Sequence, residues 1–238
     1  MVRIMLAFLG LCAATAPAAA AERRYSVNDF DRVIVEGPYV VTLATGRPSS
    51  AVASGTREAL DRVSIDVQGQ TLRIRRNRQA WGGNPGADSG LVTITLATRT
   101  LRSARLIGPA RLDLDGARGL RMEFSVEGSG RLRATGVAAD NLSLGLLGSG
   151  VLDISGTAAV LRADVQGTGS LEAERLIARN AVLATTGSGT VALTVNGPAT
   201  VAANGLGDVT IAGRATCTVT GPGADQVRCG GSNQRQDR

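Results

Sequence analysis

The sequence predicts an all-β protein built as a right-handed β-solenoid, and three observations lead to that prediction. A Gly-Ser-Gly or Gly-Thr-Gly triplet recurs along the second half of the chain with a period of about 20 residues. Short runs of alternating apolar and polar residues lie between the triplets. Aromatic residues make up only 3% of the chain, which suits a narrow core. Such a period is typical of repeat proteins whose coils stack, and parallel crossover connections are right-handed by default.

The repeat coils are predicted to extend over residues 108–230, with glycines at their corners. The expected corner glycines are the first and third residues of four triplets: Gly128, Gly130, Gly148, Gly150, Gly167, Gly169, Gly187 and Gly189. Glycine suits a corner because it adopts positive φ and allows close backbone approach. A phosphate-binding loop would need a helix after the glycines, whereas a strand is expected here. The middle residues are expected to form a hydroxyl ladder that satisfies corner amides: Ser129, Ser149, Thr168 and Ser188.

Each coil is predicted to contain two half-buried strands. An apolar residue stands four positions after the start of each triplet: Leu112, Leu132, Leu152, Leu171, Val191 and Val209. A second run leads to the next triplet, with an apolar residue four positions before it: Phe124, Leu144, Ala163, Leu183 and Val201. Alternation with period two is typical of a strand with one buried face. One coil buries too few side chains to be stable alone, so we expect neighbouring coils to stack.

Residues 25–107 are predicted to form a β region that packs on or continues the solenoid. Residues 63–67 and 71–75 flank Gly69 and Gln70, which indicates a hairpin. Residues 58–60 favour a short helical turn, and the Gly-rich stretch 77–90 favours a loop or a disordered insertion.

The first 21 residues are predicted to be a signal peptide that is cleaved near Ala21. Arg3 precedes an apolar run that ends in small residues. The run is too short to span a bilayer, and no later segment is apolar enough to anchor the mature chain. We therefore expect an exported protein, periplasmic or at the cell surface, with a single domain over residues 22–230 and a disordered tail over 231–238.

Cys217 and Cys229 are predicted to form a disulfide. They flank a Gly-Pro-Gly turn near the end of the chain, and an even pair of cysteines in an exported protein favours a covalent link.

The composition excludes several classes of function. The chain contains no His, which is the usual general base near neutral pH and the commonest metal ligand. Ser-His-Asp and Cys-His centres are therefore impossible, and the ordinary zinc sites lose a main ligand. The period of the repeat does not fit nine-residue calcium-binding repeats. We predict no catalytic residue, no cofactor and no metal.

Apolar positions in the N-terminal region carry a resemblance to a known family. The matching positions are Phe30, Val33, Val35 and Gly37, then residues 40–43, and further on Leu60, Ile65, Val67, Leu72 and Ile74. Together with the repeated Gly-Ser-Gly coils, this pattern resembles the GIN domain, the head domain of bacterial autotransporter adhesins, over residues 25–230. The resemblance implies an exported β-solenoid-like fold and no catalytic residues.

The densest group of basic residues is the candidate site for anions or glycans. It comprises Arg73, Arg75, Arg76 and Arg78, with Trp81 just beyond. One interpretation is a charged edge strand that resists aggregation, and the other is a site for acidic glycans or other envelope anions. Nucleic acid is not expected as the partner of an exported protein that has no set of stacking aromatics beside its basic residues.

The sequence predicts a non-enzymatic exported module, either adhesin-like or a binding or structural protein of the cell envelope. Its expected partners are envelope glycans or another envelope protein. The alternative is a carbohydrate-active enzyme, a polysaccharide lyase or hydrolase, that uses carboxylates on one solenoid face. Its candidate residues are Asp153 and Glu172, with Asp115 and Glu174 on the same face. A periplasmic folding or assembly factor also stays open.

Overall fold

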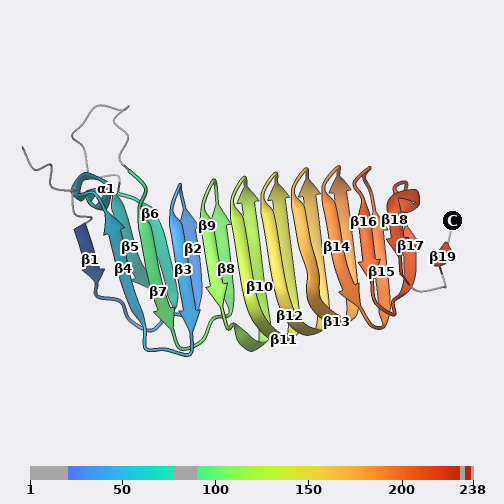
Figure 1. The fold of residues 1–238 in the computed structure, drawn as a ribbon, viewed down its shortest axis with the longest axis horizontal. Helices are drawn as coiled ribbons and strands as arrows, with labels where there is room; N and C mark the ends of the chain where they lie inside the picture. Colours follow the sequence, from blue (N-terminus) through green and yellow to red (C-terminus); the bar gives the residue numbers. More distant parts are fainter. Residues whose placement is uncertain (1–20, 78–89, 231–233, 237–238) are drawn as a thin grey trace, which may run out of the picture.

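The computed structural model describes residues 21–77, 90–230 and 234–236, and it is a single stack of β coils (Figure 1). Within these residues, helical structure is limited to α1 (Arg57–Asp61) and the 3-10 turn η1 (Ala224–Gln226). The all-β solenoid prediction is confirmed. The predicted signal peptide lies outside the described residues.

Each coil contributes one strand to each of two strand rows. The first row holds, in spatial order, β1 (Ala21–Tyr25), β4 (Ser50–Gly55), β7 (Thr93–Thr98), β3 (Val40–Thr45), β9 (Arg111–Asp115), the first parts of β11 (Arg131–Gly148), β12 (Val151–Gly167) and β13 (Ser170–Gly187), then β14 (Thr190–Val195), β16 (Val209–Ala212) and β18 (Val227–Cys229). The second row holds β5 (Val63–Gln68), β6 (Thr71–Arg76), β2 (Arg32–Glu36), β8 (Ser103–Ile107), β10 (Arg118–Gly128), the second parts of β11, β12 and β13, then β15 (Pro198–Ala203), β17 (Thr216–Thr220) and β19 (Gln234–Gln236).

The predicted apolar positions of the coils form continuous ladders through the core. Leu132 pairs with Leu152 and Leu152 with Leu171, and all three side chains are buried. In the second row, Phe124 pairs with Leu144 and lies in the core. The strands β11, β12 and β13 continue through the second corner of their coils, where the pairing register shifts. Stacking of equivalent residues therefore follows the period read from the sequence.

The triplet corners need glycine for two different reasons. The first glycine takes positive φ, as at Gly148 with φ of 114°, a region that residues with a Cβ rarely adopt. The third glycine lies against the preceding coil: a Cβ on Gly150 would be 2.6 Å from the carbonyl oxygen of Gly130. The corner amides pair with backbone carbonyls, as Ser149 N does with Gly128 O at 3.0 Å.

The predicted hydroxyl ladder is wrong. Across the described chain, the hydroxyls of the middle triplet residues make no hydrogen bond, and these residues are exposed. The physical reason is that the carbonyls of the preceding coil already satisfy the corner amides, so the hydroxyls face solvent.

The N-terminal region does continue the solenoid, but with its rungs interleaved. β2 lies between β6 and β8, and β3 lies between β7 and β9, so the first rung of the chain sits inside later ones (Figure 1). β5 and β6 form the predicted hairpin, and α1 matches the predicted helical turn. Thr56 caps α1 by accepting a hydrogen bond from Ala59 N at 3.2 Å. Most of the predicted loop at 77–90 lies outside the described residues.

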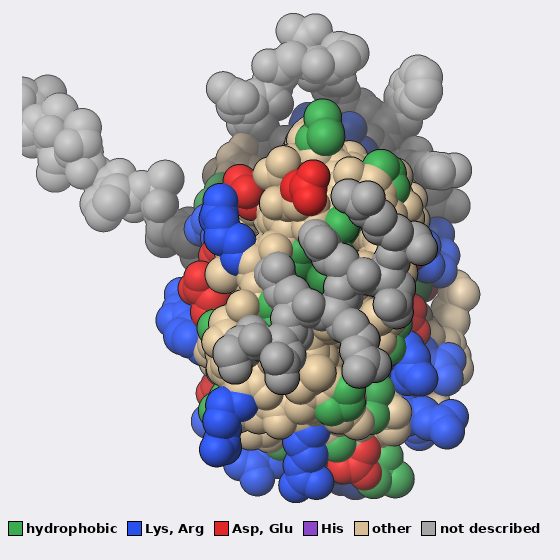
Figure 2. Space-filling model, turned by 90° about the vertical axis from the view of Figure 1, so that its right-hand side faces the viewer, with side chains coloured by type: hydrophobic (Ala, Val, Ile, Leu, Met, Phe, Trp, Pro, Cys, Tyr) green, Lys and Arg blue, Asp and Glu red, His purple; other side chains and the backbone are tan. Residues whose placement is uncertain are grey.

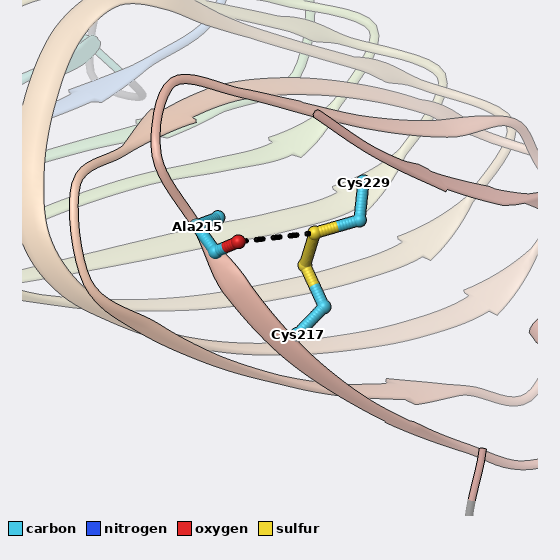
Figure 3. The surroundings of a disulfide bond; sticks show 3 residues. All are labelled: Ala215, Cys217 and Cys229. Carbon is cyan, nitrogen blue, oxygen red and sulfur yellow. Dashed lines mark hydrogen bonds between the residues drawn. A yellow bond between two sulfur atoms is a disulfide. The ribbon is translucent and has the colours of Figure 1, made fainter. Parts of the chain in front are cut away.

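The C-terminal end is closed by the predicted disulfide. Cys217 on β17 and Cys229 on β18 are linked, with their Cα atoms 6.4 Å apart (Figure 3). The bond ties β18, the last strand of the first row, to β17, which lies next to β19 in the second row. Cys229 Sγ lies 3.8 Å from Ala215 O. Three residues of the tail that was predicted to be disordered, 234–236, instead form strand β19 on β17. The exposed backbone groups at the edge of β17 offer the pairing that a free tail lacks.

Candidate functional site

A cleft of about 660 Å³, here called the arginine cleft, lies over the second row, and its lining extends from β2 to β12. Its lining residues are Arg32, Arg102, Ser103, Arg121, Met122, Glu123, Asn141, Ser143 and Arg162. Four guanidinium groups thus surround the cleft, against a single carboxylate, that of Glu123. The cleft is a candidate site for an anionic ligand because guanidinium groups recognise carboxylate, sulfate and phosphate oxygens with paired donors.

Strand alternation places the residues of the cleft on one face. Along the ladder, Arg32 pairs with Ser103, Ser103 with Glu123, Glu123 with Ser143, and Ser143 with Arg162. Arg121 pairs with Asn141 two positions earlier on β10 and β11. Side chains alternate across a strand, so these positions point outward while Met122, Phe124 and Leu142 enter the core. The cleft therefore spans the four strand steps from β2 to β12, about 19 Å in length.

Asp31 holds two of the arginines from behind the cleft. Its carboxylate lies 2.8 Å from Arg102 Nε and 3.8 Å from Arg32 Nε, and its side chain is only 7% exposed. The Asp31 carbonyl also accepts hydrogen bonds from Arg102 N and Ser103 N, at 2.7 and 3.2 Å. The buried carboxylate thus fixes the start of β8 and one end of the cleft.

The other two arginines carry uncompensated charge. Arg121 and Arg162 are exposed, and neither forms an ion pair with any residue in the described part of the chain. Their guanidinium groups therefore keep their donors available for a ligand. Figure 2, a view from the C-terminal end, shows how basic side chains surround the margins of the stack.

The arginine run predicted from the sequence lies one strand away and is largely compensated. Arg73 is 3.9 Å from a Glu36 oxygen, and Arg75 is 3.5 Å from an Asp66 oxygen. The idea of a charged edge strand is wrong, because β6 lies between β5 and β2 and the hairpin partner β5 takes the outer place. Arg76 is exposed at the end of β6. Arg78 and Trp81 lie outside the described residues.

The sequence pointed to that run because its arginines are consecutive. The arginines of the cleft come from β2, β10, β12 and the residue just before β8, and no local cluster marks them. The only signal for them is the coil register: outward positions of successive coils become neighbours once the strands are aligned.

The carboxylates proposed for an enzyme lie on the first row. Asp153 is held by Arg133 at 3.4 Å and by Arg175 at 2.8 Å, and its side chain is 12% exposed. Glu172 is its exposed neighbour in the ladder. Asp115 accepts a hydrogen bond from Thr135 Oγ1 at 3.1 Å, and Glu174 is exposed. Asp153 is thus the centre of a structural ion-pair group.

No group of three or more His, Cys, Asp or Glu residues that could hold a metal is found in the described ranges. In the same part of the chain, no helix has the length and apolarity needed to cross a membrane.

A family model described as "Putative auto-transporter adhesin, head GIN domain" matches residues 29–215. The chain belongs to this family. The match covers both the interleaved N-terminal rungs and most of the repeat coils, so the resemblance read from the sequence is confirmed. As a GIN domain of an adhesin-type family, the protein is of a kind that is exported or displayed at a surface.

Solved structures share the fold of this GIN domain. A putative adhesin from Bacteroides fragilis has a TM-score of 0.76 at 17% identity, covering 86% of this chain and 95% of that one. A putative lipid binding protein from Parabacteroides distasonis has a TM-score of 0.65 at 18% identity, covering 92% and 98%. A putative adhesin from the same species has a TM-score of 0.62 at 16% identity, covering 91% and 95%. Among curated proteins, no match is found.

Proposed function

We propose that this GIN domain is a non-enzymatic exported module that binds envelope or surface components through the outer face of its second strand row. The arginine cleft is the observation that carries the proposal. It combines four guanidinium groups with hydroxyl and amide side chains in one concavity, and convergent polar groups in a cleft are the usual mark of a binding site. Membership of an adhesin-type family supports a binding role.

The enzymatic alternative is not favoured. A pair of catalytic carboxylates needs one free nucleophile or base and one acid beside the substrate. Asp153 lies on the first row, away from the cleft, and forms ion pairs with two arginines. A carboxylate held in this way stabilises the fold and is not free to act as a nucleophile or base. We therefore expect that incubation with the polysaccharides the domain binds leaves them unchanged in length.

A glycan array and an envelope crosslinking experiment test the proposal. The mature protein, beginning after Ala21, is expected to retain a subset of acidic glycans or to crosslink to an envelope partner. Retention of no glycan together with no crosslinked partner would overturn the binding role. Shortening of a retained polysaccharide would instead restore the enzymatic alternative.

The exported location is tested by cell fractionation and N-terminal sequencing. We expect the protein in the periplasm or at the cell surface, with its first residue near Glu22. A cytoplasmic protein that keeps its first 21 residues would contradict this.

A further inference from the structure

We propose that the arginine cleft binds a linear acidic polysaccharide that carries sulfate or carboxylate groups and runs across the strands. This inference rests on the proposed binding function and names its ligand class. Three features of the cleft support it: its charge, its length, and the neutral groups between its arginines.

The charge selects an anion. Arg121 and Arg162 form no ion pair within the described chain, while Arg32 and Arg102 share the buried carboxylate of Asp31. Free guanidinium groups bind sulfate or carboxylate through paired, charge-assisted hydrogen bonds. The 2.8 Å ion pair with Asp31 restricts the Arg102 side chain, which reduces the side-chain entropy that this arginine loses when a ligand arrives.

The length selects a polymer. The arginines lie on β2, at the start of β8, on β10 and on β12, which are spread over about 19 Å. A single small anion can contact only one or two of them. A chain of sugars with repeated anionic groups can contact several, and the volume of about 660 Å³ is that of an extended organic ligand.

The groups between the arginines favour a sugar over a nucleic acid. Ser103, Asn141 and Ser143 offer hydrogen bonds to hydroxyl groups, and Glu123 can accept them. A strand with a phosphate at every residue would place negative charge beside Glu123. The lining contains no aromatic side chain for base stacking, and such stacking is the main sequence-tolerant contact to single strands.

The outward residues that follow the cleft along each strand indicate that the polysaccharide crosses the strands. Two positions further along β10, β11 and β12 stand Ser125, Gly145 and Asp164, which line a smaller hollow of about 210 Å³ with Glu127. Glu127 is already paired with Arg105. The unpaired positive charge of β10 and β12 therefore lies at Arg121 and Arg162, ahead of Ser125 and Asp164 in the chain. An anionic chain stays among the arginines only by crossing from strand to strand.

Two double variants with equal change in charge test the proposal. Arg121→Gln with Arg162→Gln removes the free charges of the cleft, and the matched control Arg73→Gln with Arg75→Gln removes two compensated charges from the neighbouring strand. All four side chains are at least partly exposed, so both variants are expected to fold. Circular dichroism and thermal unfolding of the mature protein verify this.

Affinity is measured by calorimetry with a sulfated heparin oligosaccharide, an oligogalacturonate and a neutral dextran oligosaccharide. We expect one or both acidic probes to bind and the dextran not to bind. The cleft variant is expected to lose about tenfold or more in affinity, and the control less than about twofold. The affinity of the wild-type protein is expected to fall between low and physiological ionic strength.

Each other outcome overturns the inference in a recognisable way. Equal losses in both variants would mean that binding follows net charge alone. Glycan binding that the cleft variant retains would place the site elsewhere and leave the proposed function standing. Arginine-dependent binding of phosphatidylglycerol vesicles or single-stranded DNA, without binding of either acidic glycan, would identify a different ligand class.

Discussion

The repeat coils and the interleaved N-terminal region use the same two-strand rung, but they order these rungs differently. In the coils, each rung stacks on the one that precedes it in the chain, as β12 does on β11. In the N-terminal region, β2 and β3 lie between rungs made of residues that follow them by several dozen positions. The coils can therefore form one after another along the chain. In the N-terminal region, β2 and β3 can pair only when the later strands on both sides of them have also formed.

The arginine cleft lies where these two regions meet. Arg32 comes from the interleaved strand β2, while Arg121 and Arg162 come from the coils β10 and β12. The cleft exists only when the first rung has been inserted beside β8. A binding site at this junction thus depends on the region with the most long-range pairing, while the coils beyond β12 serve as scaffold.

Deletion of whole rungs should show the largest difference between the two regions. Removal of residues 168–187 joins Gly167 to Ser188, restores the triplet and lets β14 and β15 pair with β12, because a coil contacts only its neighbours. We expect a folded β protein with a lower unfolding temperature and an intact arginine cleft. Removal of residues 32–45 deletes β2 and β3, which pair with β6 and β8 and with β7 and β9. Loss of these pairings should prevent cooperative folding.

Far-UV circular dichroism, thermal unfolding and calorimetry with the acidic glycan distinguish these outcomes. If the two deletions lower the unfolding temperature equally, the interleaved rung contributes no more to stability than a coil does, which would contradict the expected difference between the two regions.

Loss of the disulfide should destabilise only the C-terminal end of the repeat coils. Replacing both Cys217 and Cys229 with Ala is expected to cost about 3 kcal/mol, since the bond closes a loop between residues 12 apart in sequence. Hydrogen exchange should quicken in β16, β17 and β18 but not in β2 or β3. Wild-type protein under reducing conditions serves as the control, and faster exchange in both regions would show that the two ends are coupled.

Glycine-to-alanine changes compare one corner from each region. A Cβ on Gly169 would lie 2.5 Å from Gly150 O and 2.9 Å from Leu146 Cδ2, so Gly169→Ala should lower the free energy of unfolding by about 2–3 kcal/mol. Gly69, in the β5–β6 hairpin, has φ of 61° and no atom within 4 Å of such a Cβ. Gly69→Ala should therefore cost only about 1 kcal/mol, from its positive φ.

Denaturant unfolding of the two glycine variants measures the difference. Equal costs would show that conformational freedom, rather than close approach of successive coils, explains the third glycine of the triplets.

The smallest expected effect is an alkaline weakening of the N-terminal region, which holds both tyrosines of the chain, Tyr25 and Tyr39. Burial raises the pKa of the Tyr39 phenol above its ordinary value of 10.0. Above about pH 10 the unfolded chain loses this proton and the folded chain keeps it, so the free energy of unfolding falls with rising pH. Below pH 10 the residue contributes no pH dependence.

Denaturant unfolding between pH 8 and pH 11 tests this, with Tyr39→Phe as the comparison. The variant should show a shallower decline in the free energy of unfolding than the wild-type protein, because it lacks the phenol whose pKa burial raises. An unchanged decline would mean that other groups cause the alkaline weakening.

The coil ladders were predictable because their pairing is encoded locally. Leu132, Leu152 and Leu171 recur at one position of the period, and that position is buried in every coil. The hairpin of β5 and β6 and the disulfide also follow from nearby residues. The hydroxyl ladder was predicted wrongly because the pattern does not reveal that the corner amides already have carbonyl partners.

The strand period, the corner glycines, the family and the disulfide pair could all be predicted, because each depends on residue types at short or regular spacing in the chain. The order of the N-terminal rungs, the internal place of β6 and the assembly of the arginine cleft became visible only in the folded protein. Those features depend on which strands pair at long range, and an alternating strand pattern specifies a buried face without specifying its neighbours. Arg73 and Arg75 thus stand out in the sequence, whereas Arg32, Arg121 and Arg162 become a site only when the strands are aligned.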